Sequence, residues 1–406
     1  MAKFLLYALL HLIHPLSYLF PRSERRWAFG SFRGAFNDNA KYLFLYCNNH
    51  YSQATSVWLS SSRATIRLVR SLGLKAYFIA SPKGAWYALT SKYWFVNSYS
   101  SDILYAFSGG AIVVNLWHGV GLKRIEFNIT SGTLADRYQR RTLGHRFYHP
   151  EVFRRPDYML SSTPFQTAMF APAFRIPPSR CLELGYPRNE ILTCTEADRL
   201  RHVAAYEPAS TQALIASLRT RPYSTVFIYM PTWRDSQRNL FTQSFDMHRL
   251  DALLQKRNAL LLLKPHANVS TSPADYRHLH NIRFLDSNTD VYPLLPLTDV
   301  LITDYSSILY DYLLLPDKGI ILYLYDYAEY VDLRGLFYPF DENVVGHRAY
   351  TFDQLCSCIE SGDYALPAAE RDHLLVKFWG ENAQQHSPSH DLISLLLGGQ
   401  LTRLHS

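Results

Sequence analysis

The sequence predicts an α/β protein of two domains, each built on a parallel β-sheet covered by helices. Short apolar runs alternate with helical patterns through most of the chain, which is typical of parallel sheets. The alternation restarts after a polar connection at residues 196–221. A length of 406 residues also exceeds what one core usually supports. We therefore expect one domain over residues 26–200 and a second over residues 201–375.

The two ends of the chain are expected to form separate segments. Residues 1–25 contain an apolar, aromatic stretch from Phe4 to Phe20 that two histidines and a proline interrupt. This stretch is too short and too interrupted for a membrane-spanning helix, and no signal-peptide cleavage site follows it. Arginines come directly afterwards, so two interpretations stay open: a helix in the interface of an anionic membrane, or a helix packed on the protein surface. Residues 376–406 are expected to form a helical tail.

The composition excludes several classes of protein. Hydrophobic residues make up 48% and charged residues only 18%, so disorder is not expected. A net charge of +7 suits a nucleotide, a phosphate polymer or an anionic membrane surface. The five cysteines show no paired spacing, which predicts reduced thiols and a cytosolic environment. Because metal-ligand spacings, a P-loop and a dinucleotide fingerprint are lacking, no metal or cofactor is predicted.

Seven apolar runs predict the strands of the first sheet. They are Trp27–Phe32, Ser56–Leu59, Ala76–Ala80, Tyr93–Asn97, Ala111–Leu116, Tyr158–Ser161 and Cys181–Gly185. Helices are expected between them, among them Asn39–Asn49 with Asp38 as its N-cap. Ligands of such sheets bind beyond the carboxyl ends of the strands, so the loops after the strands are the places to look for a site.

The loop after Ala111–Leu116 is the first candidate site. His118 follows the strand, and Gly119 and Lys123 come after it. Histidine serves as a general base near neutral pH, and glycine lets a substrate approach the backbone closely. A histidine that only caps the strand end is the alternative. Gly119, Lys123 and Arg188, the last in a turn after the seventh strand, are candidates for binding acceptor or phosphate.

Residues 126–155 form a basic and aromatic insertion after this loop. They hold six arginines against three acidic residues. Such a segment could bind a polyanionic acceptor or an anionic lipid surface, and a solvated loop is the alternative.

Five apolar runs predict the second sheet. They are Thr225–Met230, Ala259–Leu263, Ile282–Leu285, Val300–Ile302 and Gly319–Tyr323. Polar clusters follow three of these runs directly, and carboxyl ends of parallel strands share one edge of a sheet. The clusters contain Arg234, then Lys264 and His266, then Thr303, Asp304, Ser306 and Ser307. Cations beside a serine-capped helix N-terminus predict a site for a charged phosphate group. An ordinary capped helix after a strand is the alternative for Ser306 and Ser307.

Five short motifs occur in a fixed order along the chain. They are W-H-G-x-x-L-K at Trp117–Lys123, G-Y-P-R-N at Gly185–Asn189, P-T-W-R at Pro231–Arg234, K-x-H at Lys264–His266 and T-D-Y-S-S at Thr303–Ser307, followed by Arg334-Gly335. The set resembles the CDP-glycerol glycerophosphotransferase family of teichoic acid and capsule synthesis, from about residue 37 to about residue 382. The resemblance implies a GT-B architecture, in which two Rossmann-like domains face one another across an active-site cleft.

The resemblance also implies a role for each matching residue. His118 corresponds to the general base on the acceptor hydroxyl, and His266, near Lys264, to a histidine that holds or protonates the donor phosphates. Arg234, Ser306 and Ser307 would contact the diphosphate, and Thr303 and Asp304 belong to the same motif. The chain departs from the family at Val120-Gly121, where Thr-Pro is frequent, and at Ala267, where Pro is frequent. The first departure leaves the acceptor open.

The implied function is transfer of glycerol phosphate from CDP-glycerol to an acceptor hydroxyl with release of CMP. A lipid-linked or polymeric anionic acceptor, a peripheral place on the cytoplasmic face of the bacterial membrane and no nucleic-acid partner are expected. Three alternatives stay open: a transferase that uses CDP-ribitol or another CDP-polyol, a GT-B glycosyltransferase that uses a nucleotide sugar, and a non-catalytic membrane-bound protein that binds polymer. Whether the enzyme adds one unit or many is also open.

Overall fold

The computed structural model describes residues 1–132, 134–140, 142–232, 246–264, 278–327, 335–381 and 386–403. The chain forms two compact units. The first contains residues 1–119, 124–190 and 385–406, and the second contains residues 120–123 and 191–384. The main passage into the second unit therefore comes after residue 190, ten residues before the expected boundary at residue 200, and the described residues 386–403 return to the first unit.

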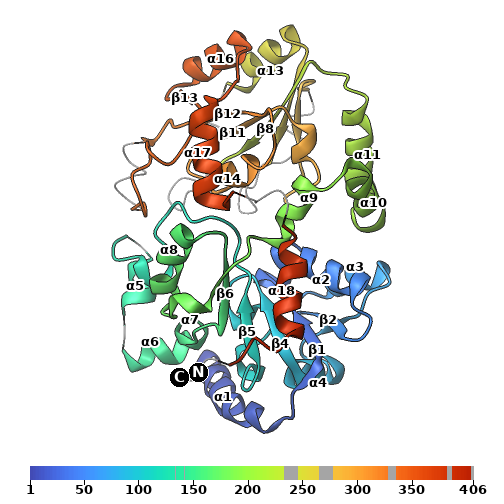
Figure 1. Ribbon diagram of the computed structural model, residues 1–406, viewed down its shortest axis with the longest axis vertical. Coiled ribbons are helices and arrows are strands. Elements are labelled where there is room, and N and C mark those ends of the chain that lie inside the picture. Colours follow the sequence, from blue (N-terminus) through green and yellow to red (C-terminus); the bar gives the residue numbers. More distant parts are fainter. Residues whose placement is uncertain are drawn as a thin grey trace. The chain divides into compact units, whose positions relative to one another are not determined.

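The first unit is organised around a parallel sheet of seven strands with the order β3-β2-β1-β4-β5-β6-β7 (Figure 1). The strands are β1 (Ser23–Phe29), β2 (Thr55–Ser60), β3 (Ala76–Phe78), β4 (Ser91–Val96), β5 (Ile112–Asn115), β6 (Tyr158–Ser161) and β7 (Cys181–Glu183). All seven strands expected from the apolar runs are present. Only β1 begins clearly earlier than expected, because its polar start, Ser23 to Arg26, pairs with strands on both sides despite its partly exposed side chains.

Helices connect these strands and cover the sheet. They are α1 (Ala2–Leu16), α2 (Asp38–His50), α3 (Arg63–Ser71), α4 (Pro82–Thr90), α5 (Ala135–Gln139), α6 (Leu143–Tyr148), α7 (Pro150–Phe153), α8 (Pro164–Phe174) and α18 (Pro388–Leu397). The prediction of Asp38 as N-cap of α2 was wrong by one residue, since Asn37 occupies the cap and Asp38 begins the helix.

The second unit holds a parallel sheet of six strands with the order β10-β9-β8-β11-β12-β13. The strands are β8 (Thr225–Met230), β9 (Ala259–Leu263), β10 (Ile282–Phe284), β11 (Val300–Thr303), β12 (Gly319–Tyr323) and β13 (His347–Ala349). The sequence reading missed β13, an edge strand of three residues whose polar start lacks an apolar run. The helices described in this unit are α9 (Glu190–Thr193, which starts at the boundary), α10 (Glu196–Tyr206), α11 (Ala209–Arg219), α13 (Met247–Lys256), α14 (Ile308–Tyr312), α16 (Phe352–Ser361) and α17 (Ala368–Trp379).

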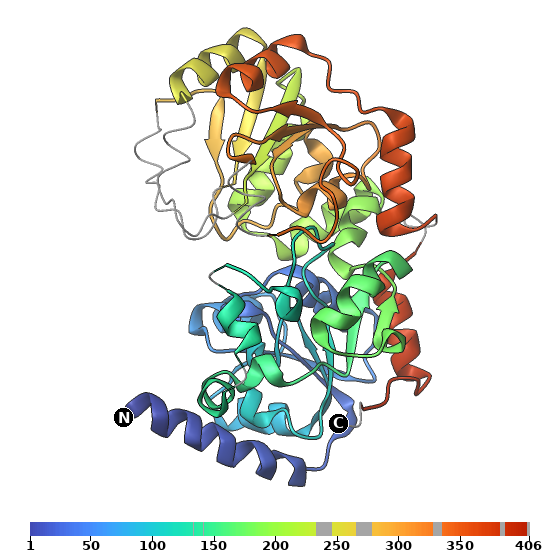
Figure 2. The same ribbon diagram turned by 90° about the vertical axis from the view of Figure 1, so that its left-hand side faces the viewer.

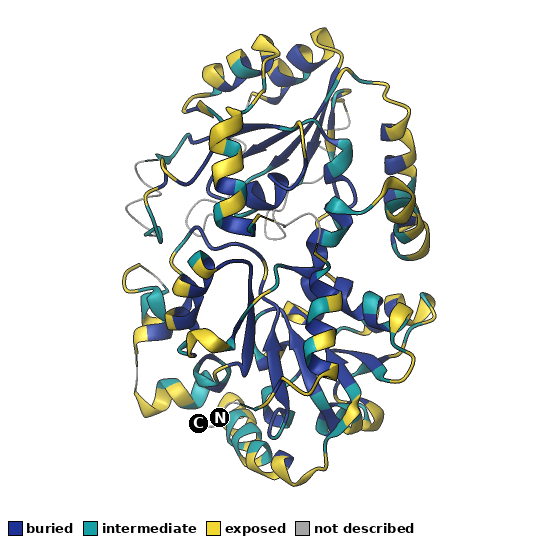
Figure 3. Ribbon diagram, in the orientation of Figure 1, coloured by how far each residue is buried: buried dark blue, intermediate teal, exposed yellow. Residues whose placement is uncertain are grey.

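Burial explains why the central strands are apolar along their whole length. Every residue of β9 and β12 is buried, as expected for parallel strands covered on both faces (Figure 3). Each unit has its own apolar cluster, which includes Trp94 and Val113 in the first and Leu261 and Ile302 in the second.

The C-terminal helix α18 is fixed to the first unit by a buried carboxylate. Glu190 accepts hydrogen bonds from the backbone N–H of Ser389 (2.6 Å) and from the hydroxyl of Ser387 (3.2 Å). Burial raises the pKa of Glu190 to about 7, and the bonds from the two serines oppose this rise. The last residue of the first unit before the chain enters the second unit therefore anchors the start of the returning helix α18.

Candidate active site

The second unit carries a polar cluster at its topological switch point, where β8 and β11 lie side by side and the strand order reverses. The hydroxyl of Thr303 donates to the carbonyl of Met230 at 2.8 Å. Both carboxylate oxygens of Asp304, which is 1% exposed, accept from the backbone N–H of Thr232 at 2.9 and 3.0 Å. Asp304 therefore fixes the loop that leaves β8.

Ser306 and Ser307 lie at the end of the same strand and are partly exposed. Ser307 occupies the cap position of α14, but no side-chain capping bond forms there. Ser307 is thus the N-cap residue, as predicted, but its side chain does not bond to the helix, and α14 has only five residues. The partly exposed hydroxyls make the end of this strand polar. A helix of five residues adds little dipole field to them.

Lys264 follows β9, which is the neighbour of β8 in the sheet. Its ammonium group donates to the carbonyls of Asp286 (2.7 Å), Ser287 (2.7 Å) and Thr289 (2.8 Å). These bonds match the three donors of an ammonium group. Burial lowers the pKa of Lys264 to about 8. Lys264 thus supports the loop after β10, and its contact with a donor stays a prediction.

Two of the expected site residues, Arg234 and His266, lie outside the described residues. The strands that precede them, β8 and β9, are adjacent and parallel. Their strand ends therefore share the edge that also carries Thr303 and Asp304.

The first unit presents His118 just beyond the carboxyl end of β5. The side-chain oxygen of Asn115 accepts the backbone N–H of Trp117 at 2.9 Å. Trp117 has a φ of 53° and Gly119 a φ of 115°. For Trp117 this left-handed conformation is strained, and such strain persists only where the surroundings hold the backbone. The loop is thus held before the histidine, and Gly119 makes the turn after it.

The imidazole of His118 is accessible to solvent at the surface of this loop. The surrounding protein nevertheless partly desolvates the protonated imidazole, which lowers the pKa of His118. Asp38 opposes this effect, Arg188 adds to it, and a hydrogen bond to the backbone of Asn97 raises the pKa. A lowered pKa keeps the imidazole neutral near pH 7, which is the form that accepts a proton.

The other candidates of the first half lie in different surroundings. The guanidinium of Arg188 is buried and bonded to Asp38 and to the carbonyl of His118. Gly119 ends its segment of the first unit, whereas Lys123 belongs to the second unit and forms an antiparallel bridge with Leu336. Binding of acceptor or phosphate by these three residues stays a prediction.

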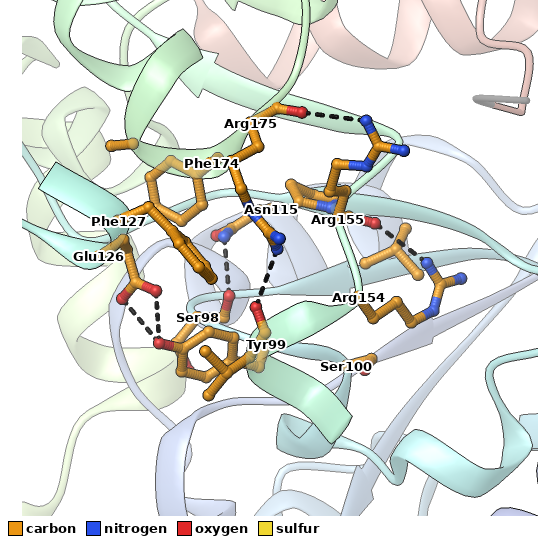
Figure 4. Close-up of a pocket in the computed structure, with 14 residues that line it drawn as sticks. Ser98, Tyr99, Ser100, Asn115, Glu126, Phe127, Arg154, Arg155, Phe174 and Arg175 are labelled. Carbon is orange, nitrogen blue, oxygen red and sulfur yellow. Dashed lines mark hydrogen bonds between the residues drawn. The ribbon is translucent and has the colours of Figure 1, made fainter. Parts of the chain in front are cut away.

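A small polar cavity lies close to this loop in the first unit (Figure 4). Asn115 and Glu126 line it together with Tyr99 and three arginines. Its volume of about 20 Å³ has room for about one water molecule and not for a substrate. Both carboxylate oxygens of Glu126 accept from the hydroxyl of Tyr99, at 2.7 and 2.6 Å, and burial raises the pKa of Glu126 to about 7. We interpret the cavity as a structural support.

The residues that support His118 could not be found from the sequence. Asp38 and Asn39 follow β1 and Asn97 follows β4, far from the W-H-G motif along the chain. Only the strand order, in which β4 lies between β1 and β5, brings these loops together.

Comparison with known proteins agrees with this arrangement. A wall teichoic acid polymerase TagF structure superposes with a TM-score of 0.72 at 23% identity, over 94% of this chain and 91% of that chain. This likeness confirms the expected GT-B-like fold. The teichoic acid glycerol-phosphate transferase of Staphylococcus aureus is 29% identical over 340 residues, which are 78% of this chain and 79% of that protein.

A second relative from Staphylococcus aureus, the teichoic acid ribitol-phosphate polymerase TarK, is 28% identical over 263 residues. That match covers 63% of this chain but only 47% of the longer relative. A profile of the CDP-Glycerol:Poly(glycerophosphate) glycerophosphotransferase family matches residues 13–377. Because this match spans most of the sequence and both units, the chain belongs to the CDP-Glycerol:Poly(glycerophosphate) glycerophosphotransferase family.

Proposed function

We propose that this enzyme transfers glycerol phosphate from CDP-glycerol to an acceptor hydroxyl and releases CMP. The family match over residues 13–377 carries this proposal, because it includes the polar strand ends of both sheets. The first relative named above, from Staphylococcus aureus, is a teichoic acid glycerol-phosphate transferase, which supports glycerol as the polyol. Synthesis of a teichoic-acid-like or capsular polymer is the process that this chemistry serves.

In this reaction the acceptor oxygen attacks the phosphorus that carries the glycerol. His118 takes the proton of the acceptor hydroxyl as the new phosphorus–oxygen bond forms. The bond between this phosphorus and the bridging oxygen breaks, and CMP leaves with that oxygen. Phosphoryl transfer needs chiefly positioning of the reactants and stabilisation of charge. The residues after β5 would position and deprotonate the acceptor, and the residues after the strands of the second sheet would stabilise charge on the donor.

The donor diphosphate is proposed to bind at the strand ends of the second unit. Arg234, His266, Ser306 and Ser307 are the ligands in this proposal. Asp304 contributes by holding Thr232, two residues before Arg234. Thr303 ties the same loop through Met230.

CDP-ribitol is the second candidate donor. The chain is nearly as similar to the ribitol-phosphate polymerase TarK (28% identity) as to the glycerol-phosphate transferase (29% identity), which supports CDP-ribitol as a candidate. None of the described contacts distinguishes a glycerol group from a ribitol group.

Release of CMP across a panel of CDP-alcohols, with phosphorus NMR of the product, tests the proposed function. We expect CMP release with CDP-glycerol and a new phosphodiester in the product. A preference for CDP-ribitol would replace the donor but keep the chemistry. A product with a new glycosidic bond and no phosphodiester would contradict the proposal.

We also propose that α1 attaches the enzyme peripherally to the cytoplasmic face of the membrane, where a lipid-linked or polymeric anionic acceptor would lie. One face of α1 packs on the protein through Phe4, His11 and His14, which stack on Phe147 and Tyr105. The opposite face exposes the leucines Leu5, Leu9, Leu12 and Leu16. Figure 2 shows the helix α1, in dark blue, at the bottom of the first unit. By length and composition alone, residues 2–19 also pass as a membrane span, which is weak evidence.

The neighbouring helix α6 carries a further exposed leucine. It contacts α1, and its Leu143 is 87% exposed. Arg140 and Arg146 flank Leu143 and are also exposed. Apolar side chains with arginines beside them suit the interface of an anionic bilayer.

A further inference from the structure

One buried side chain connects the loop of His118 with the turn that contains Arg188. The amide nitrogen of Asn39 donates to the carbonyls of Leu116 (3.3 Å) and Trp117 (2.9 Å). Its oxygen accepts the backbone N–H of Arg188 at 3.1 Å. The residues just before His118 are therefore held from α2.

The guanidinium of Arg188 continues this connection. One of its terminal nitrogens donates to the carboxylate of Asp38 at 2.6 Å, and the other donates to the carbonyl of His118 at 3.0 Å. Hydrogen bonds from a charged donor to a carboxylate are among the stronger ones in proteins. Arg188 thus links the carboxylate of Asp38 directly to the backbone of the proposed base.

Asp38 itself is held in a strained conformation. Its φ is 60°, a left-handed value that few non-glycine residues adopt. The carboxylate accepts the backbone N–H of Asn39 at 2.8 Å, which fixes its direction. The side chain of Asp38 is therefore held in this direction by its contacts with Asn39 and Arg188.

Two opposite charges act on the imidazole of His118. The carboxylate of Asp38 favours the protonated ring, and the guanidinium of Arg188 disfavours it. An interaction with the backbone of Asn97 also raises the pKa of the ring.

We infer that Asp38 is a positioning residue for His118. Through Arg188 it fixes the loop that carries the imidazole, and its carboxylate supplies a negative charge that favours the ring once it has taken up the acceptor proton. This inference rests on the proposed function, because it takes His118 as the base. It also gives Arg188 a task distinct from binding phosphate.

The substitution Asp38→Asn tests this inference with little change in shape. The amide oxygen still accepts from Arg188 and Asn39, but the negative charge is lost. We expect the pKa of His118 to fall by about half a unit to one unit. The acidic limb of the kcat/KM profile should move to lower pH by the same amount, and its plateau should fall about threefold to tenfold because the base is weaker. KM for CDP-glycerol should not change.

Arg188→Met supplies the opposite test. Removal of the positive charge should move the acidic limb to higher pH, whereas a purely structural role would move neither limb. Glu24→Gln is the matched control, since it removes one partner of the exposed ion pair with Lys92 (2.5 Å) in the same unit. The profile of this control should equal that of the wild type.

NMR titration of the His118 ring, assigned with His118→Gln, measures the same pKa without substrate. If Asp38→Asn changes neither this titration nor the pH profile while the wild type releases CMP, the inference is wrong and the proposed function stands. If the wild type releases no CMP from any CDP-alcohol, the proposed function fails, and a shifted titration still shows that Asp38 acts on His118.

Discussion

Asp102 and Asp304 have comparable places in the two units. Asp102 accepts the backbone N–H groups of Asn97 (3.0 Å) and Ser98 (2.8 Å), just beyond the end of β4. Asp304 accepts the backbone N–H of Thr232 just beyond the end of β8. Because a buried carboxylate without donors is costly, these bonds specify one conformation for each loop.

Glu126 gives a prediction at the scale of one residue. Burial raises its pKa to about 7, so its ionisation costs stability in the folded state. The cost is complete above pH 7 and absent below the pKa of the unfolded chain, near 4. Glu126→Gln should therefore be more stable than the wild type at pH 8, on the order of 2 kcal/mol.

Urea unfolding at pH 8 and at pH 5 measures this difference. The gain should shrink as the pH falls, because the wild-type carboxyl then becomes neutral as well. Glu24→Gln is the control, since this exposed carboxylate has its pKa lowered by a hydrogen bond with Lys92 and should show no such gain. A difference that stays constant between the two pH values would argue against a buried charge at Glu126.

At the scale of elements, α1 separates two interpretations that the sequence left open. The structure shows contacts with the protein on one face and exposed leucines on the other. The packing of α1 on the protein surface is therefore confirmed. Binding to a membrane stays a proposal for the face of α1 that exposes the leucines.

The double substitution Leu9→Glu and Leu12→Glu tests the outer face. These side chains are 51% and 63% exposed, so the fold should tolerate the change. Each buried leucine contributes about 1.5–3 kcal/mol to insertion, so sedimentation with vesicles of anionic lipid should fall at least tenfold. Val376→Glu, an exposed apolar position on α17, is the matched control. Equal sedimentation of the double variant and the wild type would remove α1 from the membrane proposal.

The elements also show what apolar patterning can predict. All twelve expected strands formed, because buried parallel strands are apolar over their whole length. The strand β13 was not predicted, because two of its three residues, His347 and Arg348, are polar. Ser307 occupies the N-cap of α14 without a side-chain bond, because a suitable residue type at this position does not ensure that its hydroxyl bonds to the helix.

At the scale of the whole molecule, the sequence predicted the class of site better than its internal contacts. The motifs around His118 and Thr303 lie directly after strands, where the fold must expose them. The supports of His118 come from Asp38, Asn39 and Asn97, which only the strand order brings near. Lys264 was predicted to bind the CDP-linked donor. The structure shows that its three N–H groups donate to backbone carbonyls, and no sequence motif indicates these bonds.

The account as a whole depends on His118 acting as a base in transfer from CDP-glycerol. The most direct test is CMP release by the wild type and by His118→Ala at saturating CDP-glycerol and acceptor, with donor binding measured by calorimetry. We predict a loss of turnover of about 10²–10⁴-fold with donor affinity unchanged, because the base is lost and the strand ends of the second unit are intact. Near-normal turnover of His118→Ala would contradict the account.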